Sequence, residues 1–220
     1  MNIAIVKKSV KHINIRVKPS GEVVFTAPLG TEESYIQSVI AKKRAWIEKK
    51  LKFYSDHNFG KEREKEFVSG ENFRYLGKNY RLKVMESDKN EIVLQRGYIQ
   101  LYVRDRNDFS LKKKLIEMWY QKQAGEYFEK IVQEYAAIVK KTPSSVQIRK
   151  MKTKWGSCNP EKLTITLNQK LIEKPLHCIE YVIFHELAHF LHPNHSKEFY
   201  SYLSTYMSDW EKRKRELEEV

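Results

Sequence analysis

Residues able to hold a metal ion gather between His185 and His195. The segment His185-Glu186-Leu187-Ala188-His189 places two histidines four residues apart, so that on a helix both imidazoles lie on one face. Glu186, one step round the helix, can hold a water molecule beside the same point. Two neutral imidazoles, with a carboxylate just outside the metal's own ligands, are typical of the zinc site of a hydrolase. The segment therefore predicts metal-dependent hydrolysis.

These residues are predicted to lie on one buried helix that runs from Pro175 to Leu191. Proline suits the first helical position, where its missing N–H is no loss. Apolar residues cover most of the circumference of this helix: Ile179, Val182, Ile183, Phe184, Leu187 and Phe190. Unpaired His and Glu side chains would be costly to bury there, and a bound cation removes that cost. The alternative is that both histidines belong to the core and are satisfied by backbone carbonyls.

The third metal ligand has three candidates. His192 would share the face of His189 if the helix continued, but Pro193 pushes the residue before it out of the helical region. A turn over residues 192–194 would instead bring His195 back toward the metal, with the 1–5–11 spacing of metzincins, which place a glycine at that turn. The remaining candidate is a carboxylate of the following helix, from Glu198, Asp209 or Glu211. We favour His195, with His192 facing solvent or lying behind the ligands.

The expected chemistry is hydrolysis by an activated water. A zinc ion held by three imidazoles keeps an open position for water, whose pKa falls toward roughly 7. Glu186 would take a proton from that water and deliver it to the leaving amine. The oxyanion needs a stabiliser besides the metal. Five residues are of a type that could donate to it, and the sequence does not choose among Tyr200, Tyr202, Tyr206, Arg149 and Lys154.

The elements that must position this site suggest two regions in an α+β fold. Residues 1–108 are expected to be β-rich with one helix, from about residue 31 to His57, and a polar stretch over 58–66. Strands are predicted before that helix at 3–6, 13–17 and 23–25, and after it at 73–76, 80–84, 92–94 and 98–103. Turns are predicted at 77–79 and 96–97.

Residues 109–220 are expected to form a zincin-like C-terminal domain. Its predicted order is a long helix to about Lys141, a short sheet with strands at 146–151 and 163–167, the HExxH helix, and one closing helix from Ser196. In zincin-like peptidases a strand beside the site helix binds extended substrate by edge pairing, which makes 163–167 the candidate here by analogy; alternatively, this strand only completes the core. The segment 155–158 is interpreted as a turn that forms a cleft wall, or as a turn simply packed by Trp155.

Several segments outside the histidine cluster resemble a known family. They are Lys150–Cys158, Leu163–Asn168 and His192–Phe199, with weaker similarity at 13–17, 27–28 and 46–47. Together they are similar to the YgjP-type metal-dependent hydrolases, relatives of the WLM and SprT zinc peptidases. The resemblance implies zinc ligands at His185, His189 and His195, with Glu186 as general base and a protein or peptide substrate. One departure is Tyr200, where the family pattern leads us to expect Trp.

The charge of the chain raises a second hypothesis. Its 41 Lys and Arg outnumber 28 Asp and Glu, for a net charge of +13, which is enough to suggest a nucleic-acid partner. Residues 140–154 contain several basic residues and no acidic one. The alternative function is therefore a basic, nucleic-acid-associated module whose metal site is structural or vestigial.

Composition also suggests where the protein acts. Two cysteines, Cys158 and Cys178, are too few for a disulfide framework, so we expect a reducing cytoplasm. No apolar run is long enough for a membrane span, and the first residues do not resemble a secretory leader. Cys158 could act as a soft metal ligand, but a small core residue is the simpler interpretation.

Overall fold

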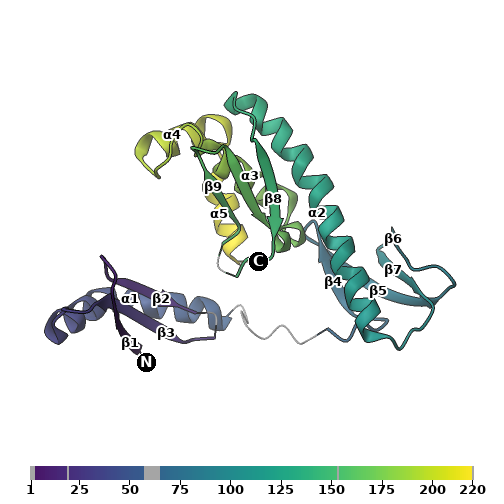
Figure 1. The fold of residues 1–220 in the computed structure, drawn as a ribbon, viewed down its shortest axis with the longest axis horizontal. Coiled ribbons are helices and arrows are strands. Elements are labelled where there is room, and N and C mark those ends of the chain that lie inside the picture. Colours follow the sequence, from purple (N-terminus) through teal and green to yellow (C-terminus); the bar gives the residue numbers. More distant parts are fainter. Residues whose placement is uncertain (1–2, 19, 57–64, 153, 220) are drawn as a thin grey trace. The chain divides into compact units, whose positions relative to one another are not determined.

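The computed structural model of the protein describes residues 3–18, 20–56, 65–152 and 154–219 (Figure 1). The chain forms two compact units, residues 1–64 and residues 65–220. The described part of the first unit has one helix and one small sheet, and that of the second has several helices and two small sheets, all of mixed direction, so the α+β prediction is confirmed. No helix in the described part of the chain is long and apolar enough to cross a membrane.

The first unit is a three-stranded sheet covered on one face by a helix. Its elements are β1 (Ile3–Lys8), β2 (Asn14–Val17), β3 (Val23–Pro28) and α1 (Glu33–Asp56). Strand β3 lies in the centre, parallel to β1 and antiparallel to β2. Alternate residues of β3 are buried with Ile36 and Ile47 of the helix, as expected for a half-buried strand. The three strands and the helix were all predicted, although His57 and residues 58–64 lie outside the described residues.

The second unit begins with a four-stranded sheet of two hairpins. Its strands, in the order β4-β5-β7-β6, are β4 (Asn72–Tyr75), β5 (Lys78–Glu86), β6 (Glu91–Gln95) and β7 (Tyr98–Val103). Both hairpins close through two residues of positive φ, Leu76-Gly77 and Arg96-Gly97, as type I′ turns require. The first turn comes earlier than the predicted 77–79, because Lys78 already pairs with Tyr75.

The first of these hairpin turns packs directly on the segment that leads into the predicted metal site. The N–H of Leu76 donates to the carbonyl of Ile172 (2.9 Å), and the N–H of Gly77 donates to that of Glu173 (3.2 Å). A Cβ atom at Gly77 would lie 2.8 Å from Cα of Pro175. The four-stranded sheet therefore belongs to the same compact unit as the site. The predicted domain boundary between residues 108 and 109 lies inside this unit. That residues 109–220 form a separate domain stays a prediction.

A long helix, α2 (Phe109–Val139), connects the sheet to the rest of the second unit. The Asp108 carboxylate accepts a hydrogen bond from the N–H of Leu111 (2.8 Å) and so caps its start. Lys140, in the left-handed conformation, ends it. The first half of α2 packs on the four-stranded sheet through Ile116, and the second half packs on the site core through Phe128 and Val132. This helix matches the predicted one closely.

The short sheet next to the site has three strands rather than two. They are β8 (Ser145–Arg149), β9 (Gly156–Asn159) and β10 (Thr164–Asn168), in the order β8-β10-β9. The segment interpreted as a turn is thus a strand, since Gly156 pairs with Leu167 and Cys158 with Ile165. Strand β10 is flanked on both sides, so the prediction that residues 163–167 form a substrate-binding edge is wrong. In the described sheet the edges are β8 and β9.

A 3-10 helix and three α-helices complete the unit. They are η1 (Gln169–Glu173), α3 (Leu176–Ala188), α4 (Lys197–Tyr206) and α5 (Trp210–Glu219). The single closing helix that we predicted is therefore two helices. Met207, which is buried, adopts an extended backbone that ends α4, and this break lets α5 pack against α3.

Candidate metal centre

Helix α3 supplies the rigid support of the predicted site. Its apolar residues are almost all buried, and Pro175 precedes its first turn, with a carbonyl that accepts from the N–H groups of Cys178 and Ile179. On its outer side Glu180 binds Arg213 of α5 (2.6 Å), and Arg213 also binds Asp209 (2.9 Å). Buried contacts on one side and this ion-pair network on the other fix the orientation of α3.

The chain reverses after α3, as the proline predicted. The helix ends at Ala188, with His189 at its C-cap, and the N–H of His192 still reaches the carbonyl of Ala188 (2.9 Å). After Pro193 and Asn194, Ser196 caps α4 by accepting from the N–H of Phe199 (3.4 Å). This turn places His195, the residue before the cap, beside the end of α3.

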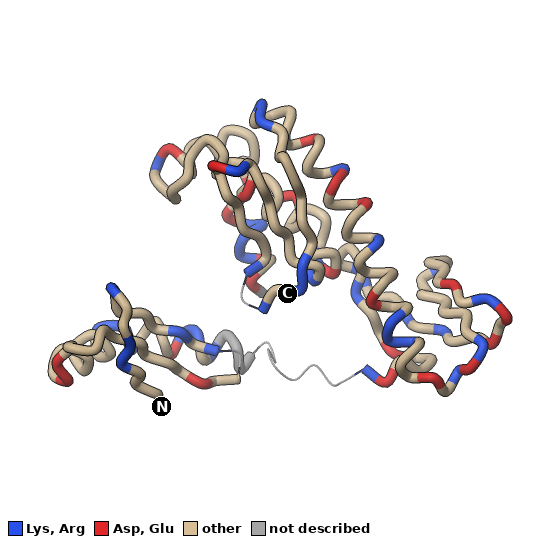
Figure 2. The backbone as a smooth tube through the Cα atoms, viewed as in Figure 1, with Lys and Arg blue, Asp and Glu red and all other residues tan. Residues whose placement is uncertain are grey.

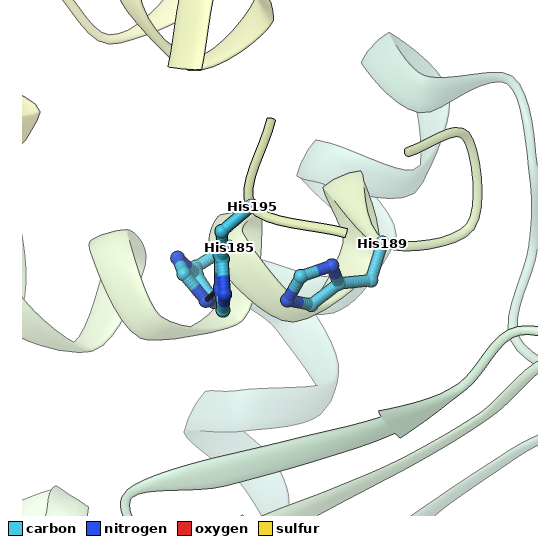
Figure 3. A group of neighbouring side chains, drawn as sticks. All are labelled: His185, His189 and His195. Atoms are coloured by element: carbon cyan, nitrogen blue, oxygen red, sulfur yellow. Dashed lines mark hydrogen bonds between the residues drawn. The ribbon is translucent and has the colours of Figure 1, made fainter. Parts of the chain in front are cut away.

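The three predicted ligands converge on one point (Figure 3). One nitrogen from each of His185, His189 and His195 lies within 4.8 Å of the other two, and Nε2 of His185 lies 2.9 Å from Nε2 of His195. The ring of His192 instead packs on Tyr202, with ring centres 5.4 Å apart. Its carbonyl accepts a hydrogen bond from Nδ1 of His189 (3.0 Å), which places His192 behind the ligands as expected.

The alternative carboxylate ligands do not join this group in the described part of the chain. Asp209 is paired with Arg213. Glu198 is fully exposed, and a hydrogen bond with Ser196 lowers the pKa of its carboxyl. Of the candidates for a third ligand, only His195 lies with the two histidines of α3.

The hydrogen bonding of His189 and the pKa values of His185 and His195 suit a bound cation. The hydrogen bond from Nδ1 of His189 leaves its Nε2 with a free lone pair, which is how metal-binding histidines are commonly oriented. Burial, together with His189 and His195, lowers the pKa of His185 to about 3, and the pKa of His195 is also lowered, mainly by burial. Neutral imidazoles with converging lone pairs are the donors that zinc takes.

The alternative of two core histidines satisfied by backbone carbonyls does not describe His185. Its Nε2 faces another imidazole, and its buried Nδ1 has no hydrogen-bond partner among the described residues. Buried polar atoms of a structural histidine normally have partners. The residues present therefore fit a bound metal ion better than a core role.

Glu186 lies next to the histidines and is buried, with 8% of its surface exposed. Burial raises the pKa of this carboxyl to about 7, and the nearby Lys154 partly opposes the shift. Its side chain rests against β9, because a Cβ atom at Gly156 would lie 2.7 Å from Cγ and from Oε1 of Glu186. Burial raises the pKa of Cys158 on the same strand to about 12, with a further contribution from Glu186.

Asn168 holds the loop that leads into β9. Its buried amide donates to the carbonyls of Met151 (2.8 Å) and Lys154 (2.9 Å). Its backbone N–H donates to the carbonyl of Trp155 (2.8 Å). Sequence reasoning gave Asn168 no role. Its position at the end of a buried strand could have indicated this role, because an amide side chain there commonly forms hydrogen bonds with the backbone.

Aromatic rings support the third histidine. Tyr200 stacks on His195, with ring centres 6.1 Å apart and planes at 21°, and Trp210 stacks on the other side of Tyr200 at 5.0 Å and 22°. The indole N–H of Trp210 donates to Ser204 (2.9 Å). The fully buried Phe199 contacts all three histidines, with ring centres 4.7 to 5.0 Å away. Tyr200, where we expected Trp, thus keeps a flat ring against the ligand.

A second group of side chains of metal-binding type lies at the other end of α3. Ligand atoms of His177, Cys178 and Glu216 lie within 4.8 Å of one another, and Nε2 of His177 lies 2.8 Å from the Glu216 carboxylate. Burial raises the pKa of Cys178 to about 11, although Lys174 and Arg213 place positive charge nearby. We interpret this group as a His–Glu contact that fastens α5 to α3.

Comparison with known proteins gives a family match and partial similarities to solved structures, among them two metallopeptidase zymogens. The family described as YgjP-like, metallopeptidase domain, matches residues 11–220. The metallopeptidase zymogen of Methanocaldococcus jannaschii jannalysin is 26% identical with a TM-score of 0.36, and that of Pyrococcus abyssi abylysin is 20% identical with a TM-score of 0.37. Each similarity covers 40% of this chain, and 90% and 89% of the respective solved chains. No curated protein matches the chain.

Proposed function

Because the chain belongs to the YgjP-like metallopeptidase family, we propose that it is a zinc-dependent peptidase that cleaves peptide or amide bonds with Glu186 as general base. Family membership supports the coarser assignment, a metallopeptidase with a metal cofactor and a protein or peptide substrate. The observation that carries the finer assignment is the convergence of three imidazoles beside a buried carboxylate.

In this proposal His185, His189 and His195 hold the zinc ion. Bound there, zinc would supply an acidified water and polarise the scissile carbonyl. The hydrogen bond to the His192 carbonyl fixes which nitrogen His189 presents, and the stack on Tyr200 and Trp210 limits rotation of His195. His189 and His195 are therefore oriented before zinc binds.

Glu186 holds and moves the proton. With its pKa raised by burial to about 7, the carboxylate can accept a proton from the attacking water near neutral pH and release it to the leaving amine. A carboxylate with an ordinary pKa would be a weaker base, and one with a still higher pKa would be protonated at neutral pH. The environment of Glu186 supports the role proposed for it.

The substrate is proposed to lie along β9. In the described sheet this strand has one paired side and one free side, and it lies against α3 beside Glu186. An extended peptide can add to such an edge through main-chain hydrogen bonds. Among the five oxyanion candidates, Tyr200 contacts His195 and Lys154 lies near Glu186, which favours these two. Tyr202 and Tyr206 pack on Phe184 instead.

Metal content and hydrolysis test the proposal together. The wild type should carry about one zinc per chain by mass spectrometry, and His195→Ala should lose it. His192→Ala is the matched control and should keep its zinc, since it is the His192 backbone carbonyl that binds His189. On a library of unstructured peptides, Glu186→Gln should keep the metal and lose cleavage. Undiminished cleavage by Glu186→Gln, or zinc retained by His195→Ala, would contradict the assignment.

The nucleic-acid hypothesis gains no support from the described residues. Figure 2 shows Lys and Arg on both units, mixed with Asp and Glu along α2. A nucleic-acid partner and a cytoplasmic location stay predictions. Binding to DNA that weakens steeply with salt, without hydrolysis, would favour the alternative module.

A further inference from the structure

The backbone of β9 approaches Glu186 more closely at Gly156 than any side chain would permit. A Cβ atom at this position would lie 2.7 Å from both Cγ and Oε1 of Glu186 and 3.0 Å from its Cδ. Carbon atoms in contact are normally about 3.5 to 4.0 Å apart. Any other residue at position 156 therefore requires Glu186 to move.

The backbone conformation of β9 does not itself require a glycine. Among the described residues, the glycines of positive φ are Gly21, Gly70, Gly77 and Gly97. Gly156 is not one of them, so its φ is open to any residue. A glycine inside a strand weakens the strand and often marks a close approach of another group. Here the approaching group is the Glu186 side chain, whose atoms are the three nearest to the added Cβ.

Both backbones at this contact are held in place. Strand β9 is paired with β10 through Gly156 with Leu167 and Cys158 with Ile165. Before this strand, the carbonyls of Met151, Lys154 and Trp155 accept hydrogen bonds from Asn168. On the other side, α3 is buried in the core. An added methyl group would thus be accommodated by rotation of the Glu186 side chain rather than by a shift of the strand.

We propose that Gly156 is a positioning residue, because the bare backbone of β9 at this point sets where the Glu186 carboxylate lies. The inference rests on the proposed function, in which Glu186 is the general base. The three atoms nearest to the added methyl group all belong to Glu186, and none belongs to a proposed metal ligand. Gly156→Ala should therefore keep its zinc and its KM while kcat falls on the order of 100-fold, as for a displacement of about 1 Å in a catalytic group.

The kinetic test compares Gly156→Ala with a matched glycine. Gly125 in α2 has no atom within 4 Å of an added Cβ and no positive φ, so Gly125→Ala should keep wild-type kcat. The double variant Gly156→Ala/Glu186→Gln should be no slower than Glu186→Gln alone, because both changes act through one carboxylate. Wild-type kcat in Gly156→Ala, or losses that add in the double variant, would overturn the inference.

A second measurement does not depend on activity. Urea unfolding of the metal-free, full-length chain is compared for Gly156→Ala, Glu186→Ala and the double variant. The destabilisation caused by Gly156→Ala should disappear once Glu186 is Ala, because the colliding side chain is gone. An equal destabilisation in both backgrounds would show that the methyl group meets something else and would overturn the inference. If this coupling is found but the wild type cleaves no peptide, the contact stands and the proposed function is wrong.

Discussion

The two ends of α3 each gather three side chains that could bind a metal, and their surroundings separate them. At the C-terminal end are His185, His189 and His195, and at the N-terminal end are His177, Cys178 and Glu216. A helix carries partial negative charge at its C-terminus and partial positive charge at its N-terminus. Ligand type alone therefore does not define a metal centre, because the local electric field favours a cation at one end and opposes it at the other.

The neighbours of each end reinforce this difference. The C-terminal end presents His185 and His195, whose pKa values are lowered and whose Nε2 atoms lie 2.9 Å apart. At the N-terminal end, His177 already pairs with Glu216, and the Cys178 thiol has a pKa raised to about 11 by burial. Zinc needs the thiolate, so a thiol with a raised pKa beside an imidazole that already contacts a carboxylate is a poor ligand set.

The largest effect on zinc affinity is expected from a histidine at the C-terminal end of α3, with a histidine at the N-terminal end as its control. His189→Ala should lower zinc affinity at least about 100-fold, because a direct ligand is lost and even residues behind the ligands are worth 10- to 100-fold. His177→Ala, on the same helix, should leave affinity unchanged. Competition with a chromophoric chelator measures both. Equal losses in the two variants would mean that the N-terminal group also binds metal.

A smaller effect is expected from the ring that supports the third histidine. Tyr200→Ala should lower zinc affinity about 10-fold, since His195 would gain rotational freedom that binding must then remove. Tyr200→Trp and Tyr200→Phe keep a flat ring between His195 and Trp210 and should bind zinc as the wild type does. The same chelator competition applies. If Tyr200→Phe were as weak as Tyr200→Ala, the hydroxyl group rather than the stack would be responsible.

The smallest effect is expected from the ion pairs near the N-terminal end. The hydrogen bond from Arg213 lowers the pKa of Asp209. This stabilisation is present above the ordinary pKa of about 3.8 and is lost as pH falls through the lowered value in the folded protein. Because the carboxylate is half exposed, Asp209→Asn should cost about 0.5 kcal/mol at pH 7. Urea unfolding at pH 7 and below pH 3 should show that the difference in unfolding free energy between the wild type and Asp209→Asn becomes smaller in acid. A difference that does not change with pH would exclude the ion pair with Arg213 as its cause.

The three histidines that the sequence predicted as ligands converge in the structure because their positions depend on local rules; that they bind a metal stays a prediction. The i, i+4 spacing of His185 and His189 and the effect of Pro193 on the preceding residue act within one turn of chain. Helix α2 was predicted for the same reason, because its apolar residues recur at helical intervals, and the structure shows that Asp108 caps it. These features need no knowledge of which distant segments meet.

The missed features all depend on distant contacts. Strand β9 has no alternating apolar pattern, and it exists because β10 pairs with it. The break at Met207 becomes visible only once α5 is seen to pack against α3 through Arg213. The glycine at position 156 lies against a side chain thirty residues away, that of Glu186. Pairing and close approach between distant segments leave little trace in local periodicity.

The shortness of the segment that carries the three histidines also has a thermodynamic consequence. Because all three lie between residues 185 and 195, an unfolded chain can still wrap them round an ion at a modest cost in loop entropy. Zinc would then bind the unfolded state as well as the native one. The stabilisation of the native state by zinc depends on the difference between these two affinities. The ion would stabilise the fold by less than its native affinity implies.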